Sequence, residues 1–399
     1  MSAMAAGFAD VFRRLTGHAP FPWQRALYEE LIADRFPTQC SLPTGVGKTS
    51  VIAVWLLALA NKPAMIPRRL VYVVNRRTVV DQTTHEVKKY LANLEAAGLR
   101  SKLEKLCAFR LRNDESPLAV STLRGQFADN QEWSADPARP AVICGTVDMI
   151  GSRLLFSGYR IGFKSRPLHA GFLGQDALLV HDEAHLEPAF QELIERIQKE
   201  QREIERTGEL PWPKLRVMAL SATARNDDSN TQAEGGKPFE LTDEEQQPPD
   251  VVPEPPVEPI HHIWRRLKAA KALHLHAIAD EKKLADEVAR LSLEHQGTDS
   301  AVRVFAQTID DVNRICDKLT EKRTGVPTDR VRRLTGTMRG LERDGLVRDP
   351  LFIRFLSEFD RPEGVTPEER TVYLVCTSAG EVGVNLSADH LVCDLSTFD

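Results

Sequence analysis

The sequence has no long apolar run, no large excess of charge of one sign and no closely paired cysteines. Its longest uninterrupted apolar segment, Val51–Ala60, is too short to cross a bilayer, which takes about 20 residues. The 399 residues carry 52 Lys and Arg against 57 Asp and Glu, a formal net charge of −5. This balance excludes a global basic field, so nucleic-acid binding would require local grooves. The length suits two domains of ordinary size.

The cysteine pattern argues against disulfides and zinc. The six cysteines are scattered, and none belongs to a C-x-x-C pair. They stand at positions 40, 107, 144, 316, 376 and 393. We therefore expect reduced core residues in a cytoplasmic protein. Near the N-terminus, Asp10, Arg13 and Arg14 interrupt a segment without a long apolar run, and we expect no signal peptide.

The stretch Pro43–Thr49, PTGVGKT, is typical of a loop that holds phosphate. Glycines let backbone N–H groups face a phosphate, and a following helix adds its N-terminal dipole. Lys48 would pair with the β- and γ-phosphates, and the Thr49 hydroxyl would bind Mg²⁺. The candidate nucleotide contacts of this loop are Thr44, Gly45, Gly47, Lys48 and Thr49.

The setting of this loop supports the interpretation, although the match to G-x-x-x-x-G-K-[ST] is imperfect. Leu42 stands where the pattern has its first glycine. However, residues 36–42 predict a short strand before the loop, and residues 50–60 predict a buried helix after it. Strand, loop and helix in this order are the context expected of a phosphate loop.

A second motif, Asp182-Glu183-Ala184-His185, follows the apolar run Ala177–Val180. A carboxylate at the end of a buried strand can complete the shell of a magnesium ion, and Asp182 is placed for that role. Glu183, one residue further, is the natural base to orient an attacking water. The two motifs together predict a chain that binds a nucleoside triphosphate and hydrolyses it, with Lys48, Asp182 and Glu183 as catalytic candidates.

Apolar strands alternate with helical patterns over residues 1–224, which predicts a parallel sheet wrapped by helices. The expected strands are residues 69–74, 118–122, 141–145, 177–181 and 216–220. Residues 225–260 then hold ten Asp and Glu and seven Pro, and we expect a linker or insertion over 225–262. A second α/β domain follows over 263–399, with strands expected at 272–278, 302–306, 331–334, 372–377 and 391–395.

The order of motifs resembles superfamily 2 helicases, in which two RecA-like domains clamp ATP between them. Ser221-Ala222-Thr223 follows a strand after the DEAH motif, and Phe21-Pro22-Trp23-Gln24 precedes the phosphate loop. The resemblance implies that Gln24 contacts adenine and that His185, Ser221 and Thr223 couple the nucleotide site to the second domain. It also places Gly383 and Asn385 at the nucleotide, although many relatives have Asp where this chain has Asn385.

The same resemblance implies contacts with the backbone of a single nucleic-acid strand. The candidate residues are Arg76, Arg77, Thr146, Gln307, Thr335, Arg339 and Thr377. Plainer interpretations stay open for several residues. Arg76 and Arg77 would equally serve as solvated charge at a sheet edge, and Thr335 and Arg339 as an ordinary helix start. Trp23 would equally serve as a core residue.

Longer stretches narrow the resemblance to the helicase of type I CRISPR systems. These stretches are VYVVNRRTVVDQ, VDMIGSRLLFSGYR, AGFLGQDALLVHDEAHL and TSAGEVGVNLSADHLVCDL. The segments 123–125 and 133–137 are similar to the subtype whose nuclease domain follows the helicase. The resemblance implies ATP and Mg²⁺ as cofactors, single-stranded DNA as ligand, and a Cascade-type effector complex and a nuclease as partners.

Two features of that family are missing from the sequence. The only His-Asp pair is His181-Asp182, within the strand of the DEAH motif, so we expect no DNA cleavage by this chain. The arginine-rich last helicase motif is also not found, and we expect a truncated second domain and weak hydrolysis. The alternatives are an RNA helicase, a restriction-type DNA translocase, and a non-catalytic module whose nucleic-acid binding is gated by nucleotide.

Overall fold

The chain divides into two compact units, Met1–Lys271 and Ala272–Asp399, each with its own parallel sheet. The computed structural model describes residues 3–75, 77–112, 114–123, 132–159, 161–208, 214–222, 237–335, 349–356, 366–377 and 386–394. The expected α/β class with two parallel sheets in tandem is confirmed.

The first unit is built on a seven-stranded sheet in the order β3-β4-β2-β5-β6-β1-β7, with every pair parallel. Its strands are β1 (Gln39–Ser41), β2 (Arg69–Val74), β3 (Ala119–Leu123), β4 (Ala141–Thr146), β5 (Ala177–Asp182), β6 (Leu215–Ser221) and β7 (Phe239–Glu240). All six strands expected in residues 1–224 are present within a few residues of their predicted ends. Because the strands run in parallel, their carboxyl ends share one edge, where the motifs lie.

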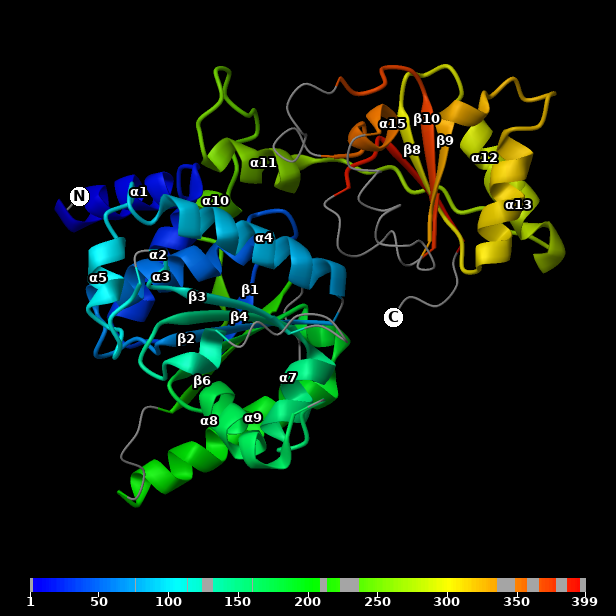
Figure 1. Cartoon of the computed structure of the whole chain (residues 1–399). Helices are drawn as coiled ribbons and strands as arrows, with labels where there is room; N and C mark the ends of the chain where they lie inside the picture. Colours follow the sequence, from blue (N-terminus) through cyan, green and yellow to red (C-terminus); the bar gives the residue numbers. More distant parts are fainter. Residues whose placement is uncertain are drawn as a thin grey trace. The chain divides into compact units, whose positions relative to one another are not determined.

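Helices cover both faces of this sheet (Figure 1). On one face lie α1 (Ala3–Thr16), α2 (Pro22–Ile32), α3 (Val51–Asn61), α4 (Arg77–Asn93) and α5 (Arg100–Glu104). On the other lie α7 (Val147–Leu154), α8 (Arg166–Gly174) and α9 (Pro188–Arg206), and the short α6 (Glu132–Ala135) contacts β3 and β4. Strand β2 shows why both faces are needed. Leu70 and Tyr72 enter one core cluster, while Val71 and Val73 enter the other.

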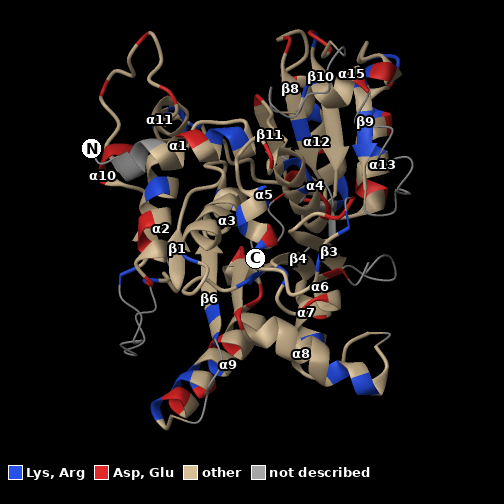
Figure 2. Ribbon diagram, turned by 60° about the vertical axis from the view of Figure 1, so that its left-hand side comes forward, with Lys and Arg blue, Asp and Glu red and all other residues tan. Residues whose placement is uncertain are grey.

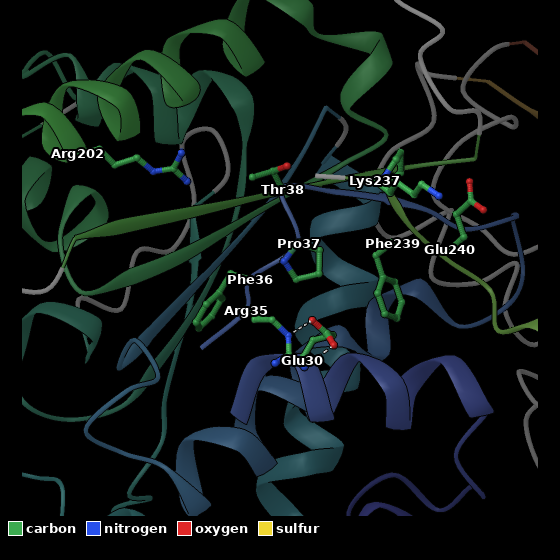
Figure 3. A pocket seen from close by; sticks show the side chains of 10 residues that line it. Glu30, Arg35, Phe36, Pro37, Thr38, Arg202, Lys237, Phe239 and Glu240 are labelled. Carbon is green, nitrogen blue, oxygen red and sulfur yellow. Dashed lines mark hydrogen bonds and ion pairs between the residues drawn. The ribbon is translucent and has the colours of Figure 1, made fainter. Parts of the chain in front are cut away.

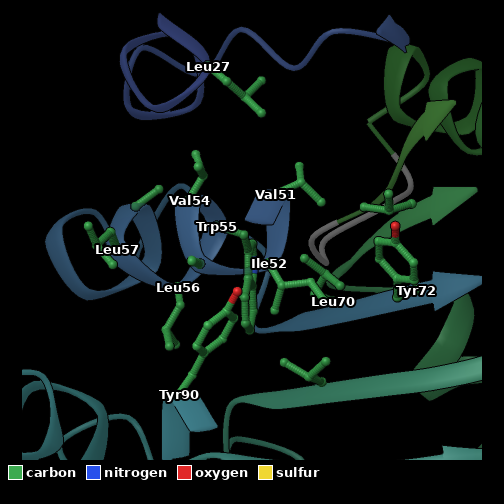
Figure 4. Packing of buried hydrophobic residues seen from close by; sticks show 14 of the residues in the cluster. Leu27, Val51, Ile52, Val54, Trp55, Leu56, Leu57, Leu70, Tyr72 and Tyr90 are labelled. Atoms are coloured by element: carbon green, nitrogen blue, oxygen red, sulfur yellow. The ribbon is translucent and has the colours of Figure 1, made fainter. Parts of the chain in front are cut away.

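Helix α3 is apolar all around, which explains its central position. Nine of its residues, Val51–Leu59, are buried, because α1 and α2 cover the side that faces away from the sheet. Figure 4 shows Ile52 and Trp55 directed toward β2. The Trp55 indole donates a hydrogen bond to the Pro67 carbonyl across 2.8 Å. The helix that follows the phosphate loop is therefore held on all sides by the core.

Charge is mixed on the surface helices, as the overall balance predicts. Helix α9 carries a buried apolar stripe with Phe190 and Ile194, and acidic and basic residues intersperse along the rest of its length (Figure 2). Within the described residues, no helix combines the length and the apolar character needed to cross a membrane. Four of the six cysteines, at 40, 144, 316 and 376, are buried, as expected of core residues, whereas Cys393 is exposed.

The acidic segment, expected as a linker or insertion over 225–262, forms elements of the first unit where the structure describes it, from residue 237 onward. Strand β7 pairs in parallel with β1, and the helices α10 (Asp243–Gln246) and α11 (Ile260–Lys268) belong to the first unit. A few apolar side chains attach these elements to the first unit, because Leu241, Ile260 and Ile263 are buried. Among the described residues, the proline-rich stretch between α10 and α11 lacks helix and strand, as predicted.

The second unit has a four-stranded parallel sheet in the order β11-β8-β10-β9. Its strands are β8 (Ala301–Phe305), β9 (Val331–Leu334), β10 (Val372–Cys376) and β11 (His390–Cys393), and its helices are α12 (Leu284–Leu293), α13 (Ile309–Leu319) and α15 (Pro350–Ile353). The strand expected at residues 272–278 is wrong. Leu273 and Leu275 are 81% and 70% exposed, and no described strand pairs with this segment. An alternating pattern predicts a strand only where a partner strand is available.

Candidate functional site

The loop after β1 adopts the conformation that its glycines predict. Gly45 and Gly47 have φ angles of +77° and +74°, in the left-handed region that favours glycine. The short 3₁₀ helix η1 (Lys48–Ser50) follows at once and continues into α3. The loop therefore ends at a helix N-terminus, which is the arrangement that binds phosphate groups.

Leu42, at the place of the first glycine of the usual pattern, belongs to the strand pairing and not to the turn. Its side chain is fully buried in the first core cluster, and its N–H donates to the Ser221 carbonyl across 2.9 Å. The residue thus extends the pairing of β1 with β6 by one position. The loop proper begins only after it.

Lys48 and Glu183 come together from two motifs 135 positions apart. Lys48 Nζ lies 2.6 Å from Glu183 Oε1, and the lysine side chain is only 9% exposed. Glu183 has a φ of +51°, an uncommon conformation for a residue with a side chain, and it turns the chain sharply at the end of β5. This turn brings the Glu183 carboxylate back to the loop that carries Lys48.

Asp182 is partly buried at the end of β5, and a residue that the sequence analysis missed holds it. The Tyr72 hydroxyl donates to Asp182 Oδ2 across 2.7 Å, and the Thr49 side chain lies near the same hydroxyl. Burial raises the pKa of the Asp182 carboxyl, while the Lys48 charge and the Tyr72 hydrogen bond act against that rise. The pKa of Tyr72 itself is raised well above its ordinary value, first by burial and then by the charge of Asp182.

This arrangement fits the predicted magnesium ligands. Thr49 and Asp182 are both oxygen donors, and both lie near the same Tyr72 hydroxyl. Mg²⁺ prefers such hard oxygen ligands and commonly takes one or two carboxylates together with substrate phosphates. The only signal for Tyr72 in the sequence was a single hydroxyl inside the apolar strand RLVYVV.

His185 and Ser221 lie beside this cluster. His185 Nδ1 is 3.6 Å from Glu183 Oε2 and 3.3 Å from Ser221 Oγ. Because β6 lies between β1 and β5, Ser221 stands between the phosphate loop and the DEAH motif. Two of the three predicted coupling residues therefore contact each other, and the third, Thr223, lies outside the described residues.

Gln24 lies at the predicted place but is occupied by contacts within the chain. Its Oε1 accepts from the Phe21 N–H across 2.9 Å, and its Nε2 donates to Ser50 Oγ across 2.6 Å. Ser50 Oγ in turn donates to the Gly47 carbonyl across 2.7 Å. Gln24 thus ties α2 to the phosphate loop and is only 3% exposed. Trp23 is a core residue, with its indole donating to the Val46 carbonyl across 3.2 Å.

The nucleic-acid candidates lie at strand ends where the structure describes them. Thr146 is the last residue of β4 and is 6% exposed. Arg77 is the first residue of α4, the helix that follows the neighbouring strand β2. In the second unit, Thr335 and Thr377 follow the paired strands β9 and β10, and Gln307 follows β8 and is exposed. Arg76, Arg339, Gly383 and Asn385 lie outside the described residues.

One surface pocket lies away from this site. It measures about 550 Å³ and is lined by residues 35–38 and 237–240, which precede or begin β1 and β7, together with Glu30 and Arg202. Figure 3 shows that Arg35 is directed at Glu30, and its two nitrogens lie 2.8 Å from the carboxylate oxygens. These residues stand at the amino ends of their strands, whereas the phosphate loop follows the carboxyl end of β1. The cavity is therefore separate from the candidate site.

Comparison with solved structures found helicases of the same fold. A structure of the DUF1998 helicase MrfA bound to DNA and AMPPNP has a TM-score of 0.55 and 16% identity, over 94% of this chain and 44% of that chain. A structure of T. fusca Cas3-ADP has a TM-score of 0.57 and 16% identity, over 98% of this chain and 44% of that chain. The chain spans less than half the length of these neighbours. Comparison with curated proteins found no significant match.

Comparison with protein-family models gives one result that covers the motifs of the first unit. The model for DEAD/DEAH box helicases matches residues 21–231, just over half of the chain. That range begins at Phe21, before the phosphate loop, and includes the DEAH motif and Ser221. The chain therefore belongs to the DEAD/DEAH box helicase family.

Proposed function

We propose that the first unit binds ATP with Mg²⁺ and hydrolyses it. The observation that carries this proposal is the meeting of Lys48, Glu183, Asp182 and Thr49 at one edge of the sheet. A basic side chain, a carboxylate base and two oxygen ligands are the groups that phosphoryl transfer to water requires. Mg²⁺ held by Thr49 and Asp182 would neutralise charge on the phosphates.

The contacts suggest how the side chains work in turn. Lys48 pairs with Glu183, so a bound triphosphate would compete for the same ammonium group. When Lys48 turns to the phosphates, the Glu183 carboxylate is released to accept a proton from water. His185 contacts both Glu183 and Ser221, so a movement of Glu183 would be transmitted through His185 to the end of β6.

We further propose that the chain moves along single-stranded DNA. The helix N-termini of α4 and α7 follow the adjacent strands β2 and β4, and such termini attract phosphate groups. Thr146 stands at the start of α7, and Thr335 and Thr377 occupy adjacent strand ends in the second unit. The structure of MrfA, a helicase of the same fold, is bound to DNA and AMPPNP, which supports the proposal that this chain binds DNA.

The biological setting that we propose is type I CRISPR defence, in which the motor would unwind target DNA for a nuclease. The motif stretches given above and the fold shared with T. fusca Cas3 support this setting. The proposed partners are a Cascade-type complex and a nuclease in the same or another chain.

The test is ATP hydrolysis by the chain with single-stranded DNA, duplex DNA and single-stranded RNA, each at two salt concentrations. We expect the largest stimulation with single-stranded DNA, little dependence on sequence, and a fall in affinity as salt rises. Stronger stimulation by RNA would favour an RNA helicase, and stimulation only by duplex would favour a restriction-type translocase. ATP binding without turnover under all conditions would favour a nucleotide-gated binding module.

A further inference from the structure

Helix α11 brings two side chains onto the phosphate loop from outside the helicase motifs. His262 Nε2 lies 3.3 Å from the Gly45 carbonyl, and the His262 ring stacks on Phe21 with centroids 6.1 Å apart. One turn later, the Arg266 Nε lies 3.1 Å from His262 Nε2. The helix is anchored by buried Ile260 and Ile263, so these contacts come from a packed element.

The Arg266 guanidinium occupies the space beside Gly45. A Cβ on Gly45 would overlap Arg266 Nη1 and Cζ and would lie 2.9 Å from Nη2. Only glycine at this position lets the guanidinium approach the loop so closely. The same glycine frees the backbone that faces phosphate, so the guanidinium lies against a surface suited to an anion.

The charges at the loop are unevenly paired. Lys48 has Glu183 as a partner, but within the part of the chain that the structure describes no carboxylate lies within ion-pair distance of Arg266. The two contacts of His262 Nε2 also exclude each other, because the nitrogen can donate to Gly45 or accept from Arg266 but cannot do both. Burial and the Arg266 charge lower the pKa of His262, which favours the neutral ring that accepts from Arg266.

We propose that Arg266 binds the phosphates of the nucleotide. It would act as a second cation of the phosphate loop, held toward Gly45 by His262. A guanidinium suits this role because its planar fork can donate two hydrogen bonds to phosphate oxygens. This inference rests on the proposed ATP site and adds a residue to it from α11, the last helix of the first unit.

The test compares R266Q with R265Q in the full chain. Arg265 is the adjacent exposed arginine of the same helix turn, and it makes no described contact with the loop, so it is a matched control. Equilibrium binding would be measured for Mg·ATP, Mg·ADP and inorganic tripolyphosphate. We expect R266Q to weaken all three on the order of tenfold or more, because hydrogen bonds between charged groups are lost. R265Q should bind like the wild type. The affinity of R266K should lie between those of the wild type and R266Q, since lysine keeps the positive charge but cannot donate two parallel hydrogen bonds.

Other outcomes would overturn the assignment. If R266Q bound nucleotide as tightly as wild type while K48A lost binding, the proposed nucleotide site would be supported and Arg266 would not be part of it. A loss for ATP without a loss for tripolyphosphate would place the side chain at the base or ribose. Tighter binding by R266Q would show that the guanidinium blocks the loop. A wild-type chain that binds no nucleotide would instead refute the proposed function itself, and thermal melting would check that R266Q is folded.

Discussion

Tyr72 donates its hydroxyl hydrogen to Asp182, from the strand next to the one that Asp182 ends. The tyrosine is 1% exposed, so its hydroxyl is shielded from solvent by the core. The same hydroxyl lies near Thr49, the other predicted magnesium ligand. One buried hydroxyl therefore orients Asp182 and lies near Thr49, two predicted ligands that come from separate motifs.

Tyr72→Phe should raise the Mg²⁺ concentration needed for ATP hydrolysis. Partners that orient metal ligands typically contribute 10- to 100-fold to metal affinity or activity, and we expect a shift of about tenfold. Titration of hydrolysis with Mg²⁺ measures it. Tyr90→Phe is the control, because it removes another buried hydroxyl from the same core cluster without touching Asp182. An unchanged titration in Tyr72→Phe would show that the tyrosine serves packing alone.

Lys48→Ala should weaken Mg·ATP binding on the order of 10- to 100-fold, because it removes a charged donor to the phosphates. The fold should survive, since the side chain lies in a polar loop and its partner Glu183 is 32% exposed. Calorimetric titration with ATP would check it, with Lys62→Ala, at the exposed end of α3, as control. Wild-type affinity in Lys48→Ala would rule out the assigned role.

Glu183→Gln should keep ATP binding and lower the hydrolysis rate by about 10²- to 10⁴-fold, the usual contribution of a general base. Glutamine keeps the shape of the side chain but cannot take a proton. Single-turnover hydrolysis in the presence of nucleic acid gives the rate. Glu187→Gln, four residues further at the start of α9, should hydrolyse like the wild type. If the rate of Glu183→Gln matched the wild type, the base would have to be another residue.

Glu245→Gln should destabilise the first unit by about 1–3 kcal/mol, because buried donors lose an acceptor. The fully buried Glu245 carboxylate accepts from Trp23 N at 3.2 Å and from Thr242 N and Oγ1 at 2.8 Å. Burial nonetheless raises the pKa of Glu245. The native state therefore binds more protons than the unfolded state, and wild-type stability falls as pH rises from the ordinary glutamate value of about 4.3 through the raised value.

The glutamine variant has no group that titrates at position 245, so its stability lacks this pH dependence. The difference in unfolding free energy between wild type and Glu245→Gln should therefore narrow as pH rises from the ordinary glutamate pKa through the raised pKa of Glu245. Urea unfolding at several pH values from 4 to 8 would measure the difference. A gap that stays constant or widens with pH would show that another group sets the pH dependence.

The sequence predicted the first sheet and its two motifs well because their signals are local. Apolar strands and the turn glycines Gly45 and Gly47 can be recognised from their immediate neighbours. Tyr72 could not be recognised in this way, because its partners Asp182 and Thr49 are distant in the chain and meet only in the folded sheet. The Gln24 contacts were missed for the same reason.

The elements at residues 239–246 and 260–268 were not foreseen, because composition averages over a window. A few anchors, such as Leu241 and Ile263, are enough to fold part of an acidic, proline-rich stretch onto the first unit. The opposite error occurred at residues 272–278, where Leu273 and Leu275 alternate with histidine but find no partner strand. Local pattern thus predicts that a segment can form an element, and the available partner decides whether it does.

The position of α11 also has a mechanical consequence. It is the last helix before the exposed connection Ala269–Ala279, and its His262 touches the Gly45 carbonyl. Tension on that connection would pull first on a helix that rests on the phosphate loop. We therefore expect nucleotide affinity to change when the connection after α11 is placed under tension.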